Sequence, residues 1–234
     1  MYHIQLLILQ IVAHLFSDFI FQYDLKAKEK DYLGFKSKFL KWHVLITFGF
    51  SWLFSFQLSF IFGALVIALS HWLIDGIKTH LNTNIKLNKY VFFIDQILHL
   101  LIIVFVVFLF NKYFEIRPFF NTTFNFKYLL IFTSYLICTK PANIFIKEVF
   151  NAFQISFSKD NDLPNAGKLI GITERLLVLT FILLNQFEAV GFLIAAKSIL
   201  RFKNDDVQKT EYVLIGTMLS FGIAIALGVI VNIV

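Results

Sequence analysis

The sequence predicts an all-α fold: a polytopic bundle of transmembrane helices with about eight spans. Hydrophobic residues make up 58% of the 234 residues, whereas only 15% are charged and 31 are phenylalanine. Soluble domains are closer to half apolar and about a quarter charged, so this composition would expose too much apolar surface in water. The apolar residues also gather in segments near the ~20 residues that a spanning helix needs. These observations predict an integral membrane protein.

Apolar segments follow one another along the chain and are joined by short polar links. We expect membrane spans at residues 3–22, 39–57, 59–80, 90–111, 127–143, 168–185, 187–200 and 211–233. The seventh segment is short for a full span, so a tilted or re-entrant helix is an alternative there. We expect a single integral membrane domain over 1–234, with one half over 1–111 and a second over 127–234.

Lysines in the links indicate how the helices are oriented. The link Tyr23–Lys41 is rich in lysine, and the stretch from Lys78 to Lys89 holds three lysines and no acid. The positive-inside rule therefore places the first, third, fifth and seventh links in the cytoplasm, with both termini outside. We read the net charge of +6 as a sign of orientation in the membrane, and we expect no nucleic-acid partner. The single cysteine excludes a disulfide scaffold and a cysteine-based zinc site.

Histidine and aspartate recur four residues apart in the expected helices, a spacing that puts both side chains on one helix face. The three pairs are His14/Asp18, His71/Asp75 and Asp95/His99. The last pair has the reverse order, and its helix also runs in the opposite direction across the membrane. With ~1.5 Å of rise per residue, the topology therefore stacks a histidine layer over an aspartate layer. His43 enters the second helix near the same level.

Imidazoles and carboxylates at one depth have the chemistry of a metal centre. Ionisable groups inside a membrane are costly and normally face a bundle interior or a water-filled cavity. Mixed sets of this kind bind zinc, manganese or non-haem iron, and they build di-metal sites inside helical bundles. We expect one or two divalent ions, zinc first, with manganese or iron as alternatives. The expected ligands are His14, Asp18, His43, His71, Asp75, Asp95 and His99. The competing readings are polar contacts that only join helices and a pathway for protons or ions.

Other polar residues are candidates for contact with a substrate. Gln22, Gln96 and Lys78 lie one residue or one helical turn from expected ligands. A second cluster in the C-terminal half lies on the same expected side of the membrane. Its members are Lys168, Glu174, Arg175, Lys197 and Arg201. Their basic side chains would suit a phosphate group. The alternative is lysines that snorkel at helix ends and Glu–Arg pairs that fix packing.

The stretches "HLFSDFIFQ", "HWLIDGIK" and "DQILH" resemble an uncharacterised bacterial integral membrane family, catalogued only as a domain of unknown function. Its motifs are H-x-x-x-D-F-x-x-Q and D-Q-x-x-H. The likeness extends to "GKLIGITER", "AAKSILRF" and "EYVLIGTMLS", so it covers most of the chain. The resemblance implies a membrane protein and no established activity. More loosely, the first four helices look like those of inner-membrane proteins described as metal-dependent hydrolases, and that likeness is an analogy.

These patterns favour a membrane-embedded, metal-dependent hydrolase at the cytoplasmic interface. Its substrate would contain phosphate and could be a lipid or polyprenyl phosphate. The ion would activate a water, and Asp18, Asp75 or Asp95 would act as general base where it is not fully used as a ligand. The alternative from another class is a transporter or channel with a His/Asp pathway for protons or metal ions. A third reading is a structural membrane subunit whose polar clusters only order the bundle.

Overall fold

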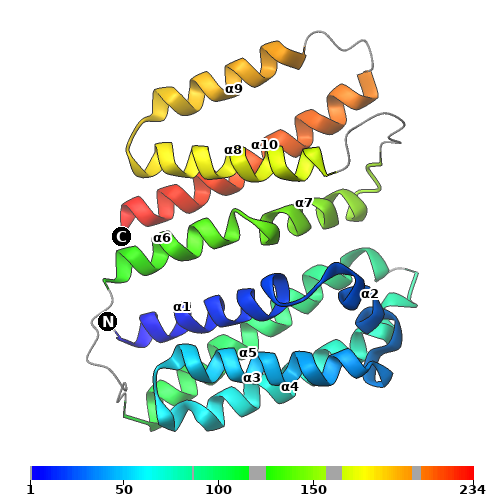
Figure 1. Ribbon diagram of the computed structural model, residues 1–234, viewed down its shortest axis with the longest axis vertical. Coiled ribbons are helices and arrows are strands. Elements are labelled where there is room, and N and C mark those ends of the chain that lie inside the picture. The colour runs from blue at the N-terminus through cyan, green and yellow to red at the C-terminus, as the bar shows by residue number, and fades with distance from the viewer. Residues whose placement is uncertain (1, 86, 116–124, 157–164, 202–206) are drawn as a thin grey trace. The chain divides into compact units, whose positions relative to one another are not determined.

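The computed structural model describes residues 2–85, 87–115, 125–156, 165–201 and 207–234, and the regular structure of these residues is helical throughout (Figure 1). The chain divides into two compact units, Met1–Leu129 and Leu130–Val234. The all-α prediction is therefore confirmed. Each unit has a hydrophobic core of its own.

The first unit is a bundle in which α4 is central. Its elements are α1 (Tyr2–Leu15), the π-helical turn η1 (Phe16–Ile20), α2 (Asp24–Leu33), η2 (Gly34–Lys36), α3 (Lys38–Ser55), η3 (Leu58–Phe60), α4 (Ile61–Asn82), η4 (Asn88–Tyr90) and α5 (Val91–Tyr113). Helix α4 packs against α2, α3 and α5, while α1 packs against α3 and α5. Aliphatic residues such as Leu6, Ile67 and Val106 form the core at one end of this bundle, with Phe60 and Phe110 in edge-to-face contact.

Along the part of α4 that faces the His/Asp cluster, polar side chains point inward and large apolar side chains point outward. On α4, His71, Asp75 and Gly76 are buried, whereas Leu69 and Leu73 on the opposite side are about half exposed. Water-soluble helices show the reverse pattern. This distribution suits helices that are surrounded by lipid.

Three stretches among the described residues are long and apolar enough to cross a membrane, namely Leu58–Asn82, Asn88–Tyr113 and Val207–Ile233. The count rises to five if each of two bent helix pairs forms one span. The expected number of about eight spans is therefore not confirmed. Helix α3 is 18 residues long but opens with Lys38 and Lys41, and α9 has only 15 residues, or about 22 Å of length.

The first expected span is sharply bent. Helix α1 and η1 together end at Ile20, and the chain then turns by 93° into α2. The segment from Asp24 to Leu33 was expected to be part of a lysine-rich link, but it folds as a helix that packs on α4. The inner face of this helix carries Ala27 and Lys30, which are one turn apart, so a lysine faces the bundle.

The contact between α2–η2 and α4 depends on two glycines. Gly34 has a positive φ of 52°, and a Cβ there would lie 2.2 Å from Thr79 Oγ1. On the other side of the contact, a Cβ at Gly76 would lie 2.1 Å from the ring of Phe35. Both positions therefore exclude a larger residue, and together they fix α2 close to α4.

The second unit contains a broken helix and a three-helix core. Its helices are α6 (Phe126–Ile137), α7 (Lys140–Ala152), α8 (Ala166–Leu183), α9 (Phe187–Arg201) and α10 (Val207–Ile233). Helix α8 packs against α7, α9 and α10. Helices α6 and α7 meet at 49°, with Pro141 in the first turn of α7. A proline is tolerated in a first helical turn because its missing N–H would have no partner there.

The glycine contact gives a testable expectation for stability. Gly76→Ala should lower the free energy of unfolding by about 1–3 kcal/mol, because the Phe35 ring and η2 have to move away. Gly49→Ala in α3 is the matched control, since a Cβ there meets nothing within 4 Å. Denaturant unfolding in detergent micelles measures both variants. Equal stabilities would contradict the described contact.

Candidate metal centre

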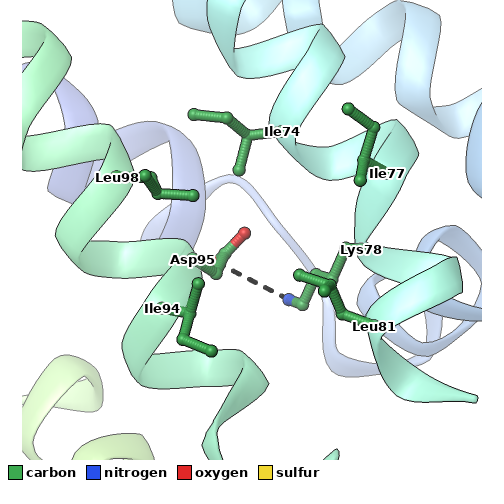
Figure 2. A pocket seen from close by; sticks show the side chains of 7 residues that line it. All are labelled: Ile74, Ile77, Lys78, Leu81, Ile94, Asp95 and Leu98. Atoms are coloured by element: carbon green, nitrogen blue, oxygen red, sulfur yellow. Dashed lines mark ion pairs between the residues drawn. The ribbon is translucent and has the colours of Figure 1, made fainter. Parts of the chain in front are cut away.

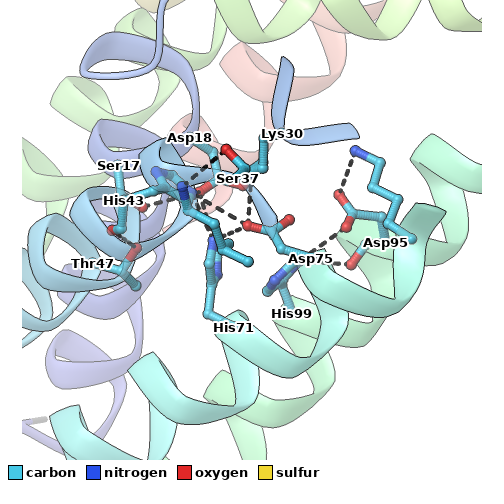
Figure 3. A network of polar contacts seen from close by, with 12 residues as sticks. Ser17, Asp18, Lys30, Ser37, His43, Thr47, His71, Asp75, Asp95 and His99 are labelled. Atoms are coloured by element: carbon cyan, nitrogen blue, oxygen red, sulfur yellow. Dashed lines mark hydrogen bonds and ion pairs between the residues drawn. The ribbon is translucent and has the colours of Figure 1, made fainter. Parts of the chain in front are cut away.

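All seven expected metal ligands are brought together inside the first unit. They come from five different elements of the bundle, and Figure 3 labels six of these residues, all except His14. Those buried side chains are His14 from α1, Asp18 from η1, His43 from α3, His71 and Asp75 from α4, and Asp95 and His99 from α5. The sequence pattern thus predicted the gathering of these side chains, while their role as ligands stays a prediction.

Two imidazoles and two carboxylates form the middle of the cluster. His43 Nε2 lies 2.8 Å from His71 Nε2. Asp18 Oδ1 lies 3.4 Å from His43 Nε2 and 3.3 Å from His71 Nε2. Asp75 Oδ2 lies 3.6 Å and 3.3 Å from the same two nitrogens. Ligand atoms bonded at about 2.0–2.1 Å to one tetrahedral zinc lie about 3.3–3.4 Å apart, so three of these five distances match a shared ion.

The π-helical turn η1 positions Asp18. Such turns shift side chains around the helix and often occur at functional sites. The Ser17 hydroxyl lies 3.0 Å from Asp18 Oδ1 and donates a hydrogen bond to it, and His14 Nδ1 lies 3.7 Å from the same oxygen. The carboxylate is thereby aimed at the two central imidazoles, even though α1 ends three residues earlier.

Three imidazoles from α1, α4 and α5 pack against one another, as the reversed order of the third pair predicts. The ring centroids of His71 and His99 are 4.0 Å apart, and those of His14 and His99 are 5.3 Å apart. Gln96, a predicted neighbour of the ligands, joins this row to the aspartates. Its Oε1 lies 3.3 Å from His14 Nε2, and its Nε2 donates to Asp95 Oδ2 at 3.1 Å.

A backbone hydrogen bond sets the tautomer of His99. Its Nδ1 lies 2.8 Å from the carbonyl oxygen of Asp95, and since a carbonyl can only accept, Nδ1 carries the proton. In the neutral ring Nε2 is then unprotonated, which is the form that binds a metal. This buried nitrogen has no hydrogen-bond partner among the described residues, and the same holds for Asp75 Oδ1 and Asp95 Oδ1.

Lys30 is the member of the cluster that the sequence analysis missed. Its side chain is 2% exposed, and its Nζ donates to Asp75 Oδ2 at 2.6 Å. In the sequence it looks like any other lysine of a cytoplasmic link. Helical spacing is the signal that could have identified Lys30. Ala27 and Gly34 lie one turn before and one turn after it, so all three share the face of α2–η2 on which the neighbouring side chains are small.

Lys78, a predicted substrate-binding residue, lies at the edge of the cluster. Its Nζ is 3.1 Å from Asp31 Oδ1 and 3.6 Å from Asp95 Oδ2. The network around the centre thus contains four carboxylates, those of Asp18, Asp31, Asp75 and Asp95, and only two ammonium groups. If the imidazoles are neutral, this network has a net charge of −2. The Asp31 carboxylate is about a third exposed, whereas the other three carboxylates are buried, where a charge is very costly unless it is paired or binds a metal.

Three groups of side chains among the described residues have the geometry to hold an ion. They are His14/Asp18/His71, His43/His71/Asp75 and Asp75/Asp95/His99, with ligand atoms within 4.8 Å of one another in each group. The groups share His71 and Asp75, so they form one continuous centre. The ligand atoms, the excess of acid and the unpartnered buried atoms all fit a divalent metal ion.

The other predicted substrate contacts are not in this cluster. Gln22 is half-buried in the bend between η1 and α2. In the second unit, Lys168 is exposed at the start of α8, and Lys197 of α9 pairs with Glu174 of α8. The side chain of Arg201 lies outside the described residues.

Arg175 is buried in the second unit, and its hydrogen bonds all go to neutral oxygens. It donates to the carbonyl groups of Cys138 (2.8 Å) and Thr139 (3.4 Å), where α6 ends. It also donates to Ser220 Oγ at 2.9 Å and Asn143 Oδ1 at 2.6 Å. Basic side chains often satisfy the last carbonyls of a helix. In this structure Arg175 closes the break between α6 and α7, and its predicted role toward a substrate stays a prediction.

Comparison with known proteins identifies a family. Residues 6–127 match the family described as "Protein of unknown function (DUF3307)", which is just over half of the 234 residues. The chain belongs to the DUF3307 family. The resemblance to a family of unknown function, which the motifs indicated, is therefore confirmed over residues 6–127, whereas its extension to "GKLIGITER", "AAKSILRF" and "EYVLIGTMLS" is not confirmed. The DUF3307 match contains all seven candidate ligands and Lys30. No curated protein and no solved structure matches the chain.

The ion pair between Lys30 and Asp75 predicts a large effect on stability. In metal-free buffer, Lys30→Met should lower the free energy of unfolding by about 3–5 kcal/mol, because it leaves a buried carboxylate unpaired. Denaturant unfolding in detergent measures this effect. Lys28→Met, on the exposed side of α2, should change little.

The double variant Lys30→Met/Asp75→Asn separates charge from packing. The Asp75→Asn change removes the carboxylate charge that Lys30→Met leaves unpaired, so the double variant should regain most of the lost free energy of unfolding. If Lys30→Met is no more harmful than Lys28→Met, the described pair does not exist in the protein.

Arg175 gives a second expectation. Arg175→Lys keeps the positive charge but removes the planar set of guanidinium N–H donors. The buried carbonyl groups of Cys138 and Thr139 therefore lose their hydrogen-bond partner. Thermal unfolding should show a loss of at least about 2 kcal/mol. The control is Lys168→Arg, an exposed charge-conserving change on the same helix, which should be neutral. Equal melting of the two variants would rule out the capping role.

Proposed function

We propose that this DUF3307 protein is a membrane-embedded, metal-dependent hydrolase. It acts on a phosphate-containing substrate, such as a lipid phosphate, at the cytoplasmic face of a bacterial inner membrane. The observation that carries the proposal is the central cluster, where the Nε2 atoms of His43 and His71 share two carboxylate oxygens at 3.3–3.6 Å. Zinc suits these ligands best, with manganese or iron as alternatives.

The proposal extends to the number of spans. The two bent pairs would each form one span, and α3, α8 and α9 would cross the membrane beside them. Together with the three long spans this gives the eight that the sequence predicts. The 18 residues of α3 and α8 correspond to about 27 Å, close to the thickness of the hydrocarbon core.

Charge supports a divalent cation in preference to an anion at the centre. Two uncompensated carboxylates in a buried network attract a doubly charged ion, and one such ion would make the network neutral. The competing way to neutralise it is to protonate two imidazoles. Metal analysis distinguishes these two states directly.

The residues of this chain have separable roles in hydrolysis. A bound divalent ion supplies Lewis acidity and lowers the pKa of a water molecule toward neutrality. Whichever of the Asp18, Asp75 and Asp95 carboxylates is not fully used as a ligand can take the proton of that water. Lys78, at the half-open edge of the cluster, can bind the charge of the phosphate. Lys30 holds Asp75 in place.

A transporter or channel is the second candidate. The continuous row of imidazoles from His14 through His99 to His71, with ring centroids 4.0–5.3 Å apart, favours it. Chains of histidines and acids also carry protons through membrane proteins.

Metal content tests the proposed centre. Protein purified without chelator should hold stoichiometric zinc, manganese or iron, and His71→Ala should lose it, because His71 belongs to two of the three groups. His80→Ala is the matched control, since His80 is exposed on the same helix. Elemental analysis by mass spectrometry measures both variants.

Activity then separates the two candidates. Protein in detergent–lipid micelles should release phosphate from a lipid phosphate in a reaction that a chelator stops. A folded protein that is free of metal and moves protons across vesicle membranes would refute the hydrolase and support the transporter.

A further inference from the structure

We infer that the centre holds two divalent cations, bridged by the Asp75 carboxylate. The first occupies the His43/His71 position, formed by His43, His71, Asp18 and Asp75. The second occupies the Asp95/His99 position, formed by Asp75, Asp95 and His99. The inference rests on the proposed function, and it deepens that function by assigning a second ion and the side from which a substrate reaches it.

The Asp95/His99 position is marked by three buried atoms without partners. Asp75 Oδ1, Asp95 Oδ1 and His99 Nε2 make no hydrogen bond to any described residue. Each of the three residues is at most 4% exposed, and the three form one of the groups able to hold an ion. Leaving three acceptors of this kind buried and unsatisfied is costly. A cation at this position would satisfy all of them together.

The two oxygens of Asp75 face different surroundings. Oδ2 receives the hydrogen bond of Lys30 and faces the central imidazoles, whereas Oδ1 has no partner among the described residues. A carboxylate with one oxygen toward each of two positions is a bridging ligand. Two-metal hydrolytic sites hold their ions about 3.5–4 Å apart.

The net charge of the network indicates which kind of substrate a second ion would attract. One divalent ion neutralises the network of four carboxylates and two ammonium groups, so a second ion leaves two positive charges. A phosphate ester supplies the negative charge that balances them. Inorganic phosphate should therefore strengthen binding of the second ion more than binding of the first.

A crevice lies beside the second position, and Asp95 is the residue of that position that lines it. It has a volume of about 90 Å³, and Figure 2 shows aliphatic side chains of α4 and α5 around Lys78 and Asp95. Its outer wall includes Ile77 and Leu98, which are partly exposed. The Asp95/His99 position is therefore approached between α4 and α5, while α2 and Lys30 cover the His43/His71 position.

Counting bound zinc tests the inference. Protein stripped of metal and equilibrated with Zn²⁺ should bind two ions per chain. His99→Asn and Asp95→Asn should each bind one, and His43→Asn should also bind one. The control His80→Asn should keep two. A wild-type protein that saturates at one zinc, or a His99→Asn variant that still binds two, would overturn the second ion.

The outcomes separate this inference from the proposed function. If the wild-type protein binds one zinc per chain, and that zinc is lost in His71→Ala but kept in His99→Asn, only the inference of a second ion is overturned. If the wild-type protein binds no zinc, both this inference and the proposed function are overturned. Because a variant could fail to fold, Mn²⁺-loaded wild-type protein gives an independent readout. Its electron paramagnetic resonance spectrum should show two coupled ions. At sub-saturating Mn²⁺, the signal of the coupled pair should be stronger with inorganic phosphate than without it. A spectrum of isolated Mn²⁺ at saturation overturns the inference.

Discussion

The excess of buried negative charge in the first unit is the constraint on which its structure depends. Asp18, Asp75 and Asp95 lie among four buried imidazoles, and the ammonium groups that face them among the described residues are those of Lys30 and Lys78. Carboxylates in such surroundings are tolerated only if they are paired, hydrogen-bonded or bound to a metal. The bend after η1, the inward face of α2 and the close packing of α2 on α4 all serve to bring one ammonium group to Asp75.

The second unit buries a positive charge instead of negative charges, and it stabilises that charge without an ion pair. It buries a cation, Arg175, and satisfies it with neutral oxygens at the break between α6 and α7. This arrangement needs no counter-ion, because the carbonyls at a helix C-terminus carry partial negative charge. The two polar clusters that look alike in the sequence therefore differ in kind. The first has unsatisfied ligand atoms, and the hydrogen bonds of Arg175 in the second hold a helix break together.

The sequence predicted the helical fold and the seven side chains of the first cluster because their signals are local. A histidine and an aspartate four residues apart in an apolar helix must face the same way, as His71 and Asp75 do. Lys30 could not be predicted in this manner, because its role depends on a 93° turn and on the contact between Gly34 and Gly76. The number of spans is not confirmed for a related reason, since hydropathy does not show where a helix ends or turns.

The central claim is that the atoms around His43, His71 and Asp75 are ligands of a metal ion. Anomalous diffraction at the zinc absorption edge, from crystals of the protein grown with zinc, tests it most directly. The account predicts a strong peak between the two Nε2 atoms and the Asp75 carboxylate, with the imidazoles moved apart to bind it. Well-ordered side chains without a peak, and with the two nitrogens still hydrogen-bonded to each other at 2.8 Å, would contradict it.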